Sequence, residues 1–540
     1  MNIKLRAFIA GVVGMAVAFG ITELIHGLYE PVPSMPSAVA QRVVVLSPGS
    51  VVEFGIGILR EADVPFLIVT TVVFTLVFAG LLALLALSSV IAALIGVGVL
   101  GAIAVAASFS EPFVRPVAVA FAVVAALGIG AGVSGFLLYT SDLRGAGTAS
   151  SPGSLEKDKG REPRGVRARE AYSRSGIAVS RRNFIALSGA AAVAGLGAAG
   201  TGRLLGRQGM QTAGSTAPSG GAAPAAQETL SAAPAGASID APGMSPLFTS
   251  NEDFYLIDTA ISSPRINRDT WSFKVKGEID NPIELSYSDL LSLPTREADI
   301  TLSCVSNEVG GRLVSNARWT GVLLSDVLKE AGLSRDKVSG ASEQLVGRSV
   351  DGWTSGFPTD IAFDGREALV AFGMNGDELP VEHGYPVRLV VPGLYGYVSA
   401  TKWLSEIELT DWDFDAYWIK RGWSKEGPIK TQSRIDTVKD GDKLSAGNTQ
   451  IGGIAWAPAR GIERVEVSTD DGETWNDATL ATQLDVDAWR LWIYDWDARS
   501  GEHTIKVRAT DGEGETQTAQ KAAPIPSGAT GYHTVSVTVS

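Results

Sequence analysis

Four long apolar runs within the first 140 residues constrain this chain more than any other feature. Each is close to the roughly 20 residues that an α-helix needs to cross the hydrocarbon core of a bilayer. The alternative is a set of buried helices in a soluble protein, but four successive runs with so few charges favour membrane helices. We therefore expect a four-helix membrane region over residues 1–140, with runs at about 7–27, 64–87, 89–109 and 113–139.

A basic segment follows the apolar runs and indicates their orientation. Residues 141–182 contain ten lysines and arginines, and Lys4 and Arg6 precede the first run. An excess of positive charge beside membrane helices marks the cytoplasmic side. Four crossings return the chain to the side on which it started, so both basic segments agree with a cytoplasmic loop over 141–182.

The next apolar segment, residues 183–205, begins just after a pair of arginines. The stretch Ser180-Arg181-Arg182-Asn183-Phe184-Ile185, followed by weakly apolar Ala and Gly residues, resembles a twin-arginine export signal placed internally. The alternative is a fifth membrane helix whose basic end stays inside. Either interpretation places everything after residue 205 on the extracytoplasmic side of the cytoplasmic membrane.

Residues 206–244 are mostly Ala, Gly, Pro, Ser and Thr, with few large apolar side chains. Such a segment buries too little apolar surface to offset the entropy lost on ordering. We expect a disordered linker. Several small-x-small sites leave open whether it is cleaved.

The second half of the chain has a different composition, because all twelve tryptophans lie at Trp271 or later. Strand-like runs alternate with helical stretches such as 321–331, so we expect an α+β domain over 245–432. From 433 to 540 the pattern becomes all β, with period-two alternation at 463–468. An immunoglobulin-like sandwich is expected there, with large core residues Trp475, Trp489, Trp492 and Trp496.

Charge and cysteine content exclude several classes of function. The net charge of −13 opposes the basic surface that nucleic-acid binding needs, so no nucleic-acid partner is expected. The single cysteine, Cys304, can form neither an internal disulfide nor a thiolate-cluster metal site. It ends a strand-like run and precedes a glycine-rich loop. On its own, a buried structural cysteine is the favoured interpretation.

A long, ordered series of residues downstream changes that interpretation. Together with Cys304, the series resembles the sulfite oxidase family of molybdopterin-dependent oxidoreductases. The resemblance covers about 245–540, and it implies a molybdopterin-binding domain followed by a dimerisation domain over 433–540. The series runs through Asn375-Gly376, Leu379-Pro380, His383-Gly384-Tyr385-Pro386-Val387-Arg388, Val391-Pro392-Gly393, Gly396 and Lys402-Trp403-Leu404.

The resemblance implies a molybdenum–molybdopterin cofactor (Moco) and assigns roles to individual residues. Cys304 is the implied catalytic residue and metal ligand, because a soft thiolate stabilises a high-valent oxo-metal. Implied cofactor contacts follow at His383, Arg388, Ser399, Thr401 and Lys402 and, more loosely, at Asn251, Tyr255 and Asp351.

Two departures from the family pattern bear on the substrate. Glu308 follows Asn307, where sulfite oxidases carry an arginine that helps to hold the anion. A carboxylate there repels sulfite. Trp353 stands where relatives often carry tyrosine, which removes a hydroxyl donor. Arg312, Arg318 or Arg366 could supply the missing positive charge, and the sequence does not show which of them reaches the pocket.

The chain offers no second redox centre of a familiar kind. It contains no Cys-x-x-Cys-His motif, and His26 is the only histidine in the first half, so no haem is expected in this chain. Electrons must therefore pass to or from a separate partner, a cytochrome or a quinone-linked protein. The membrane region serves as an anchor or docking surface, and the resemblance suggests a homodimer through the C-terminal domain.

Three functions compete at this point. The first is a membrane-anchored extracytoplasmic oxidoreductase that oxidises sulfite, a small oxyanion, to sulfate. The second uses the same cofactor to reduce S-oxides such as oxidised methionine, and Glu308 favours it because a neutral sulfoxide needs no anion pocket. The third is a cofactor-free envelope binding protein, against which the joint presence of Cys304, His383, Arg388 and Lys402 argues.

Overall fold

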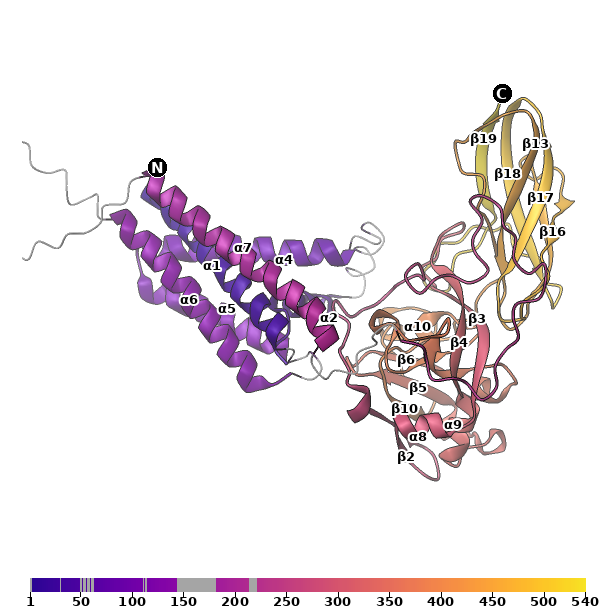
Figure 1. Ribbon diagram of the computed structural model, residues 1–540, viewed down its shortest axis with the longest axis horizontal. Helices are drawn as coiled ribbons and strands as arrows, with labels where there is room; N and C mark the ends of the chain where they lie inside the picture. Colours follow the sequence, from indigo (N-terminus) through magenta and orange to yellow (C-terminus); the bar gives the residue numbers. More distant parts are fainter. Residues whose placement is uncertain are drawn as a thin grey trace, which may run out of the picture. The chain divides into compact units, whose positions relative to one another are not determined.

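The computed structural model describes residues 2–142, 181–212 and 221–540, with short gaps at 30, 49–50, 52–54, 56–58, 60–62, 110 and 112–113. The expected basic loop over 141–182 thus lies almost entirely outside the described residues. The chain forms two compact units, residues 1–213 and 214–540 (Figure 1).

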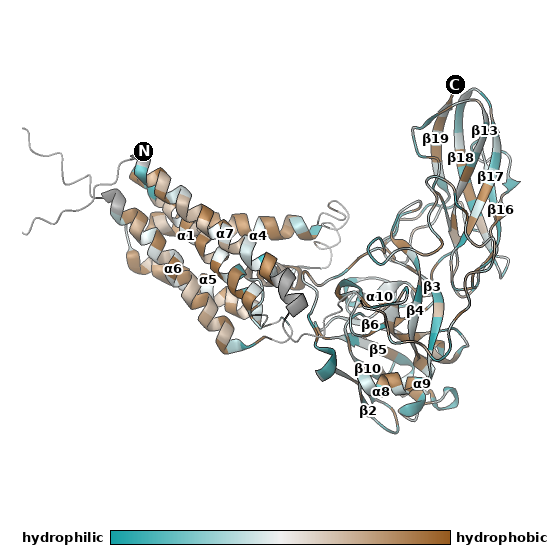
Figure 2. Cartoon of the chain, viewed as in Figure 1, coloured by the Kyte–Doolittle hydropathy of each residue, from teal (hydrophilic) through white to brown (hydrophobic). Residues whose placement is uncertain are grey.

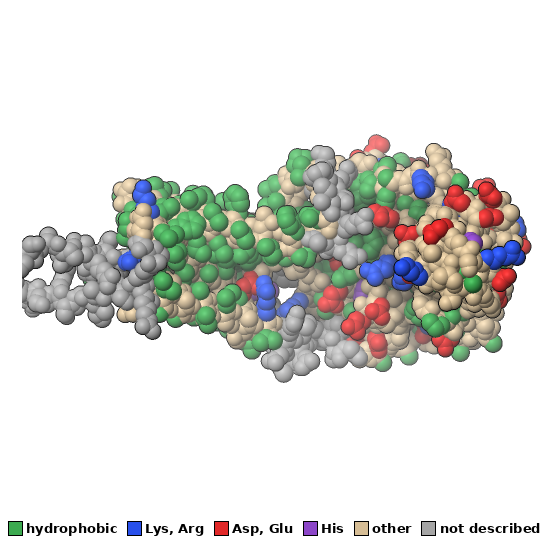
Figure 3. Space-filling model, turned by 90° about the horizontal axis from the view of Figure 1, so that it is seen from above, with side chains coloured by type: hydrophobic (Ala, Val, Ile, Leu, Met, Phe, Trp, Pro, Cys, Tyr) green, Lys and Arg blue, Asp and Glu red, His purple; other side chains and the backbone are tan. Residues whose placement is uncertain are grey.

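Apolar helices form the described part of the first unit, and five of them are long and apolar enough to cross a membrane. Large side chains such as Phe74, Ile91 and Phe121 are at least 74% exposed. Figure 2 shows that these helices consist mostly of hydrophobic residues, and Figure 3 shows hydrophobic side chains on their surface in that view, which is typical of contact with lipid. The helices are α1 (Ile3–Leu28), the short α2 (Met35–Leu46), α4 (Asp63–Ala86), α5 (Val90–Ser108), α6 (Pro116–Asp142) and α7 (Arg181–Thr212).

Glycines bring α1 and α7 into close contact. A Cβ added to Gly20 would lie 2.2 Å from the carbonyl oxygen of Gly195, and one added to Gly27 would lie 2.0 Å from that of Gly202. Small residues at such contacts let membrane helices pack backbone to backbone. Because the paired numbers rise together, α1 and α7 run in the same direction, whereas α4 and α6 run antiparallel to α1. This order agrees with four alternating crossings followed by a fifth.

Two sheets build the α+β part of the second unit, as expected. One sheet has the order β2-β1-β10-β5-β6, and the other has the order β3-β4-β7-β8 with β9 also paired to β7. The first contains β1 (Ser272–Gly277), β2 (Ile283–Ser286), β5 (Gln344–Ser349), β6 (Thr354–Pro358) and β10 (Leu404–Thr410). The second contains β3 (Thr295–Ser303), β4 (Val314–Leu323), β7 (Leu369–Met374), β8 (Asp377–Glu378) and β9 (Arg388–Val390). Three short helices accompany them, α8 (Tyr287–Ser292), α9 (Leu324–Glu330) and α10 (Gly396–Ser399).

Residues 432–540, called the C-terminal domain below, form two sheets around a common core. One sheet contains β11 (Gln432–Ile435), β13 (Gly447–Trp456), β17 (Arg490–Ala498) and β16 (Thr479–Leu480). The other contains β12 (Lys443–Leu444), β19 (His533–Val539), β18 (Gly501–Asp511), β14 (Ile462–Ser468) and β15 (Asn476–Asp477).

The four tryptophans expected in this core have different surroundings. Trp492 and Trp496 belong to it, as expected. Trp489 instead packs into the core of the α+β part, and its indole N–H donates to the carbonyl oxygen of Leu247 at 2.9 Å. Trp475 is only half-buried and packs edge-on against Tyr532. Alternation of apolar and polar residues along a strand identifies which face of the strand is buried. It does not show whether that face packs into the core of the C-terminal domain or into the core of the α+β part.

Residues 221–244 are bound to the second unit, so the expectation of a disordered linker was wrong for them. A segment without large apolar side chains forms no core of its own, but its backbone groups pair with the edges of existing strands. For example, the N–H of Ala223 donates to the carbonyl oxygen of Gly376 at 2.9 Å, and the N–H of Glu228 donates to that of Thr295 at 3.0 Å. The carbonyl oxygen of Gly236 accepts the N–H of Thr482 at 2.9 Å. Composition alone does not reveal such edge pairing.

Asp487 lies where the C-terminal domain packs on β3. Its carbonyl oxygen accepts the N–H of Thr301 at 3.0 Å, and its carboxyl group accepts the N–H of Ala459 at 2.7 Å. Burial raises the pKa of Asp487 to about 7, although the Ala459 hydrogen bond opposes the shift. This carboxyl group therefore links the stability of the domain contact to pH.

The sign of that link follows from the raised pKa. Between pH 3.8, the pKa of an ordinary aspartate, and pH of about 7, the pKa of Asp487 in the folded chain, the folded chain binds more protons than the unfolded chain. The free energy of unfolding therefore falls as the pH rises through this window. We expect Asp487→Asn to raise the free energy of unfolding by about 1–3 kcal/mol near pH 8 and by little near pH 4. Thermal unfolding of the full chain in detergent measures this. The exposed Asp497→Asn serves as control, and equal effects of both substitutions would contradict the expectation.

Candidate active site

Cys304 lies directly after β3, at the start of the 304–313 loop that leads into β4. Its N–H donates to the carbonyl oxygen of Leu313 at 2.9 Å, which closes the base of the loop. The residue is 9% exposed. Burial raises the pKa of the Cys304 thiol, and hydrogen bonds from Ser306 oppose this only in part. The thiol therefore keeps its proton at neutral pH.

Two tyrosines lie close to Cys304, the partly buried Tyr255 and the buried Tyr395. Burial raises the pKa of Tyr255, and the nearby Cys304 raises it further. Burial also raises the pKa of Tyr395 to about 12, again with a contribution from Cys304. Both phenols are thus neutral near pH 7 and keep a hydrogen to donate. Tyr395 was not among the expected residues, although it lies within the recognised series, directly before Gly396.

Arg388 is a buried cation on which the carboxylate of Asp258 acts without forming a direct ion pair. It is 4% exposed, and its guanidinium lies 5.1 Å from the ring centre of Trp319. It donates to the backbone carbonyl oxygens of His383 and Leu389, at 3.0 and 3.3 Å. No carboxylate of the described chain forms an ion pair with it within 4.0 Å. Burial lowers the pKa of Arg388 to about 10, so it stays charged at neutral pH.

His383 contacts Arg388 through its carbonyl group and is itself neutral. Its Nε2 lies 2.9 Å from the carbonyl oxygen of Asn251, which only accepts, so Nε2 carries the hydrogen. Burial, followed by the charges of Lys402 and Arg388, lowers the pKa of His383 to about 4. The other ring nitrogen, Nδ1, is then an acceptor at neutral pH.

Lys402 is the second buried cation, and it is paired. Its Nζ lies 2.6 Å from Asp258 Oδ1 and donates to the carbonyl oxygen of Glu382 at 2.7 Å. Burial lowers the pKa of Lys402, and Asp258 opposes this shift. Asp258 was not expected from the sequence, because no motif marks it. A Cβ on Gly384 would lie 3.1 Å from the Cβ atoms of both Arg388 and Lys402, which explains the glycine after His383.

The remaining expected residues are placed less directly. The Thr401 hydroxyl is buried against that of Ser355 at 2.6 Å, and the Ser399 hydroxyl donates to a backbone carbonyl oxygen at 3.1 Å. Asp351 accepts the N–H of Trp353 at 3.0 Å and acts on the pKa of Lys402. The structure therefore brings Asn251, His383, Arg388 and Lys402 into one cluster, with Asp351 at its edge. The hydroxyls of Ser399 and Thr401 form bonds within the protein.

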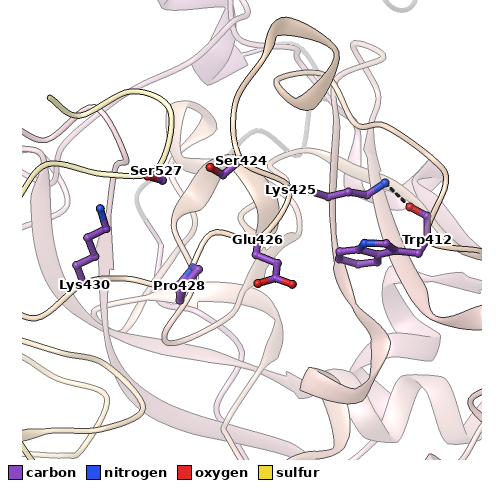
Figure 4. A pocket seen from close by; sticks show the side chains of 7 residues that line it. All are labelled: Trp412, Ser424, Lys425, Glu426, Pro428, Lys430 and Ser527. Carbon is purple, nitrogen blue, oxygen red and sulfur yellow. Dashed lines mark hydrogen bonds between the residues drawn. The ribbon is translucent and has the colours of Figure 1, made fainter. Parts of the chain in front are cut away.

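A pocket of about 500 Å³ is lined by none of the residues of this cluster, and Tyr395, which lies close to Cys304, contacts its wall. The Tyr395 hydroxyl lies 3.5 Å from the backbone N of Lys430, a residue of the pocket wall. Figure 4 shows Lys425 extended toward Trp412, whereas Lys430 lies on the other side of the pocket, near Ser527. The pocket is lined by Trp412, Ser424, Lys425, Glu426, Pro428, Lys430 and Ser527.

Comparisons with known proteins identify the family. Residues 260–418 match the oxidoreductase molybdopterin binding domain, and residues 427–540 match the Mo-co oxidoreductase dimerisation domain. An uncharacterized oxidoreductase of Bacillus subtilis, YuiH, is 32% identical over 157 residues, which cover 29% of this chain and 74% of that protein. The chain belongs to the sulfite oxidase family. It is a molybdopterin oxidoreductase of the sulfite oxidase type, with Moco as its cofactor.

Other similar proteins cover less of their own length or show the fold alone. Rat mitochondrial sulfite oxidase is 31% identical over 271 residues, which cover 42% of this chain and 49% of the relative. The chain spans about half the length of the mammalian sulfite oxidases that it matches. Among solved structures, the sulfane dehydrogenase SoxCD from Paracoccus pantotrophus is 23% identical, with a TM-score of 0.45, over 53% of this chain and 80% of that chain.

The residues of this sulfite oxidase family member fit an anionic cofactor. Around His383, which is neutral, Arg388 and Lys402 supply two buried positive charges against the one carboxylate of Asp258. A buried excess of positive charge is costly unless an anion such as a phosphate or a dithiolene accompanies it. Several donors, Trp353 Nε1, Tyr417 Oη and Arg421 Nε, are buried without partners in the described chain and suit a polar ligand.

None of the three arginines considered as substitutes for the missing family arginine is available as a free cation in the cluster. Arg318 binds both oxygens of Asp299 at 2.8 Å, and Arg366 binds Asp364. Arg312 is exposed. Lys430, which sequence reasoning did not consider because no motif includes it, lies in the wall of the pocket.

Proposed function

We propose that this chain oxidises sulfite to sulfate, with water as the oxygen source: sulfite and water give sulfate, two protons and two electrons. The observation that carries the proposal is the single buried thiol of Cys304, which lies close to the neutral phenols of Tyr255 and Tyr395, together with the cation Arg388, which also acts on Tyr255. The cofactor, when bound, supplies the two-electron oxygen-atom chemistry. The two electrons leave to a separate acceptor, such as a cytochrome or a quinone-linked protein.

We propose that this chain's residues bind the cofactor as follows. Cys304 is the metal ligand, because it is the chain's only thiol. Arg388 and the Nδ1 of His383 hold the pterin, and Lys402 with the backbone around Ser399 and Thr401 holds the phosphate. Asn251 orients His383 through the hydrogen bond to its Nε2. Tyr255 and Asp351 complete the surroundings of the cofactor.

The pocket of Figure 4 supports an anionic substrate. Lys430 Nζ donates to the carbonyl oxygen of Gly528 at 2.7 Å and forms no ion pair in the described chain, whereas Lys425 is paired with Asp415 at 3.2 Å. Burial lowers the pKa of Lys430, which indicates incomplete solvation of its charge. A cation of this kind attracts an oxyanion. Serine hydroxyls at Ser424 and Ser527 can donate to the same ligand.

We further propose that the first unit anchors the chain in the cytoplasmic membrane and that the second unit works on the extracytoplasmic side. The parallel course of α1 and α7 supports an odd number of crossings before the second unit. Arg181 and Arg182 at the start of α7 support the twin-arginine-like segment. The match of 427–540 to a dimerisation domain supports a homodimer, and its two-sheet core supports an immunoglobulin-like type.

One assay separates sulfite oxidation from its alternative. The alternative is reduction of S-oxides such as methionine sulfoxide, which Glu308 favours because a neutral substrate needs no cation. The full chain, purified in detergent with its cofactor, is tested for sulfite-dependent reduction of ferricyanide and for sulfoxide-dependent oxidation of a reduced viologen. Turnover with sulfite supports the proposal. Turnover with sulfoxide and none with sulfite would overturn it in favour of the reductase.

Lys430→Ala tests whether the pocket receives the anion. We expect the KM for sulfite to rise about 10-fold with little change in kcat, because the lost charge contributes to binding before the reaction. The difference should shrink at high salt. Lys425→Ala is the matched control, since its charge is already paired with Asp415. An equal rise of KM in both variants, or none in Lys430→Ala, would contradict this role.

A further inference from the structure

The 304–313 loop that carries Cys304 forms hydrogen bonds of its own at its base and one at its tip, where the N–H of Gly311 donates to the carbonyl oxygen of Glu308 at 2.8 Å. The Asn307 side chain accepts the N–H of Leu313 at 2.8 Å, and the N–H of Asn307 donates to the carbonyl oxygen of Cys304 at 3.1 Å. The tip of the loop consists of Gly310 and Gly311, between β3 and β4. Two side chains of the C-terminal domain, more than a hundred residues later in the sequence, contact this tip.

The first of these side chains is Arg434 on β11, which is buried. Its guanidinium donates to the carbonyl oxygen of Gly311 at 2.8 Å, to Asp436 Oδ1 at 2.6 Å and to the hydroxyl of Ser245 at 2.8 Å. All three bonds are charge-assisted, and their different directions fix the guanidinium plane. A fixed guanidinium in turn fixes the carbonyl group of Gly311.

The second side chain is His533 at the start of β19, whose ring lies directly against Gly310. A Cβ added to Gly310 would lie 2.2 Å from His533 Cδ2, so no larger residue fits without movement. Gly310 also has a φ of 79°, a left-handed conformation that glycine adopts without strain. The ring itself is held, because Nδ1 accepts the N–H of Ile435 at 3.0 Å. Arg434 and His533 thus contact two neighbouring residues at the tip of one loop, Gly311 and Gly310.

We propose that Arg434 and His533 are positioning residues that hold the cysteine loop, so that the C-terminal domain sets the place of the thiol. The inference rests on the proposed role of Cys304 as the metal ligand. The loop joins two strands of one sheet, yet its tip is bonded to another domain. Release of the tip lets the loop open about its base and exposes the thiol, while the strands on either side stay paired. The C-terminal domain is then part of the construction of the metal site as well as a surface for dimerisation.

The chain's single cysteine makes a direct test possible. The full chain is produced without cofactor, and the rate at which a thiol reagent such as Ellman's reagent modifies Cys304 is measured. We expect Arg434→Gln to raise this rate about 10-fold or more, because loss of the charge-assisted bond to Gly311 favours local opening of the loop. Arg434→Lys should restore part of the protection.

Arg508→Gln is the matched control. Arg508 also belongs to the C-terminal domain and pairs with a buried carboxylate, Glu466, at 2.8 Å, but it has no bond to the loop. Its rate should match that of the unsubstituted chain. Equal rates in Arg434→Gln and the unsubstituted chain would overturn the proposal, and so would equally raised rates in both variants, which would indicate general loosening. Gly310→Ala, which displaces the His533 ring, provides a second variant should Arg434→Gln fail to fold.

Metal retention separates this inference from the assignment of the ligand. In cofactor-loaded protein, Arg434→Gln should lose molybdenum to dialysis about 10-fold faster than Arg508→Gln, by analogy with other residues that orient a metal ligand. Faster thiol labelling with unchanged molybdenum retention would support the positioning of the loop by Arg434 but refute Cys304 as the metal ligand. Unchanged labelling with faster loss would place the effect elsewhere and overturn the positioning role.

Discussion

Replacement of Cys304 by alanine is expected to abolish turnover and remove molybdenum, while the second unit stays folded. The chain has no other thiol, and no group of three or more His, Cys, Asp or Glu side chains in the described residues is arranged to hold a metal ion. We expect turnover to fall by at least about 1,000-fold, which corresponds to about 4 kcal/mol of lost transition-state stabilisation. Molybdenum content per chain and sulfite-dependent turnover measure the two effects.

The same substitution is expected to cost little stability in the cofactor-free chain. Alanine removes one sulfur atom and the burden of a buried thiol, so the free energy of unfolding should change by about 1 kcal/mol or less. Ser303→Ala, at the preceding buried position, is the control, because its hydroxyl has only a long contact of 3.5 Å with a carbonyl oxygen. Full molybdenum content in Cys304→Ala would refute the ligand assignment. A large loss of stability would indicate a structural cysteine instead.

The long apolar helices and the residue series could be predicted from the sequence for distinct physical reasons. A bilayer imposes a minimum apolar length, so five helices follow from local composition, including the weakly apolar α7. The series from Asn375 to Leu404 is contiguous, so its His383, Arg388 and Lys402 fold into one neighbourhood with short chain connections. Cys304 was recognised only through that series, because an isolated buried cysteine carries no signal of its own.

The site residues that were not predicted from the sequence contact the site across long separations in the chain. Asp258 pairs with Lys402 across 144 residues, and Arg434 reaches the cysteine loop across 123. No periodicity or motif encodes such pairs. The bound segment 221–244 escaped for another reason, because backbone pairing with a strand edge depends on the partner and not on the side chains of the segment. The substitute for the family arginine was sought among arginines, whereas the cations that line the pocket are the lysines Lys425 and Lys430.

Arg388→Met is expected to separate cofactor binding from stability. Arg388 is a buried cation whose hydrogen bonds go to backbone carbonyl groups, with Trp319 as the only ring beneath it. Without the cofactor its charge is poorly compensated, and methionine fills a similar volume without that desolvation cost. We expect the free energy of unfolding of the cofactor-free chain to stay the same or rise by about 1 kcal/mol, whereas cofactor occupancy falls at least about 10-fold.

Arg460→Met is the matched comparison, because it removes a partly buried arginine that does have a buried carboxylate partner. Arg460 lies 2.9 Å from Asp511, which is 1% exposed and would be left without its cation. Removal of one member of such a pair costs about 3 kcal/mol or more. Denaturant unfolding of both cofactor-free variants, with molybdenum analysis of the loaded forms, gives the comparison. If Arg388→Met destabilises the chain as much as Arg460→Met does, the guanidinium is a structural element, and the excess positive charge was not built to receive an anion.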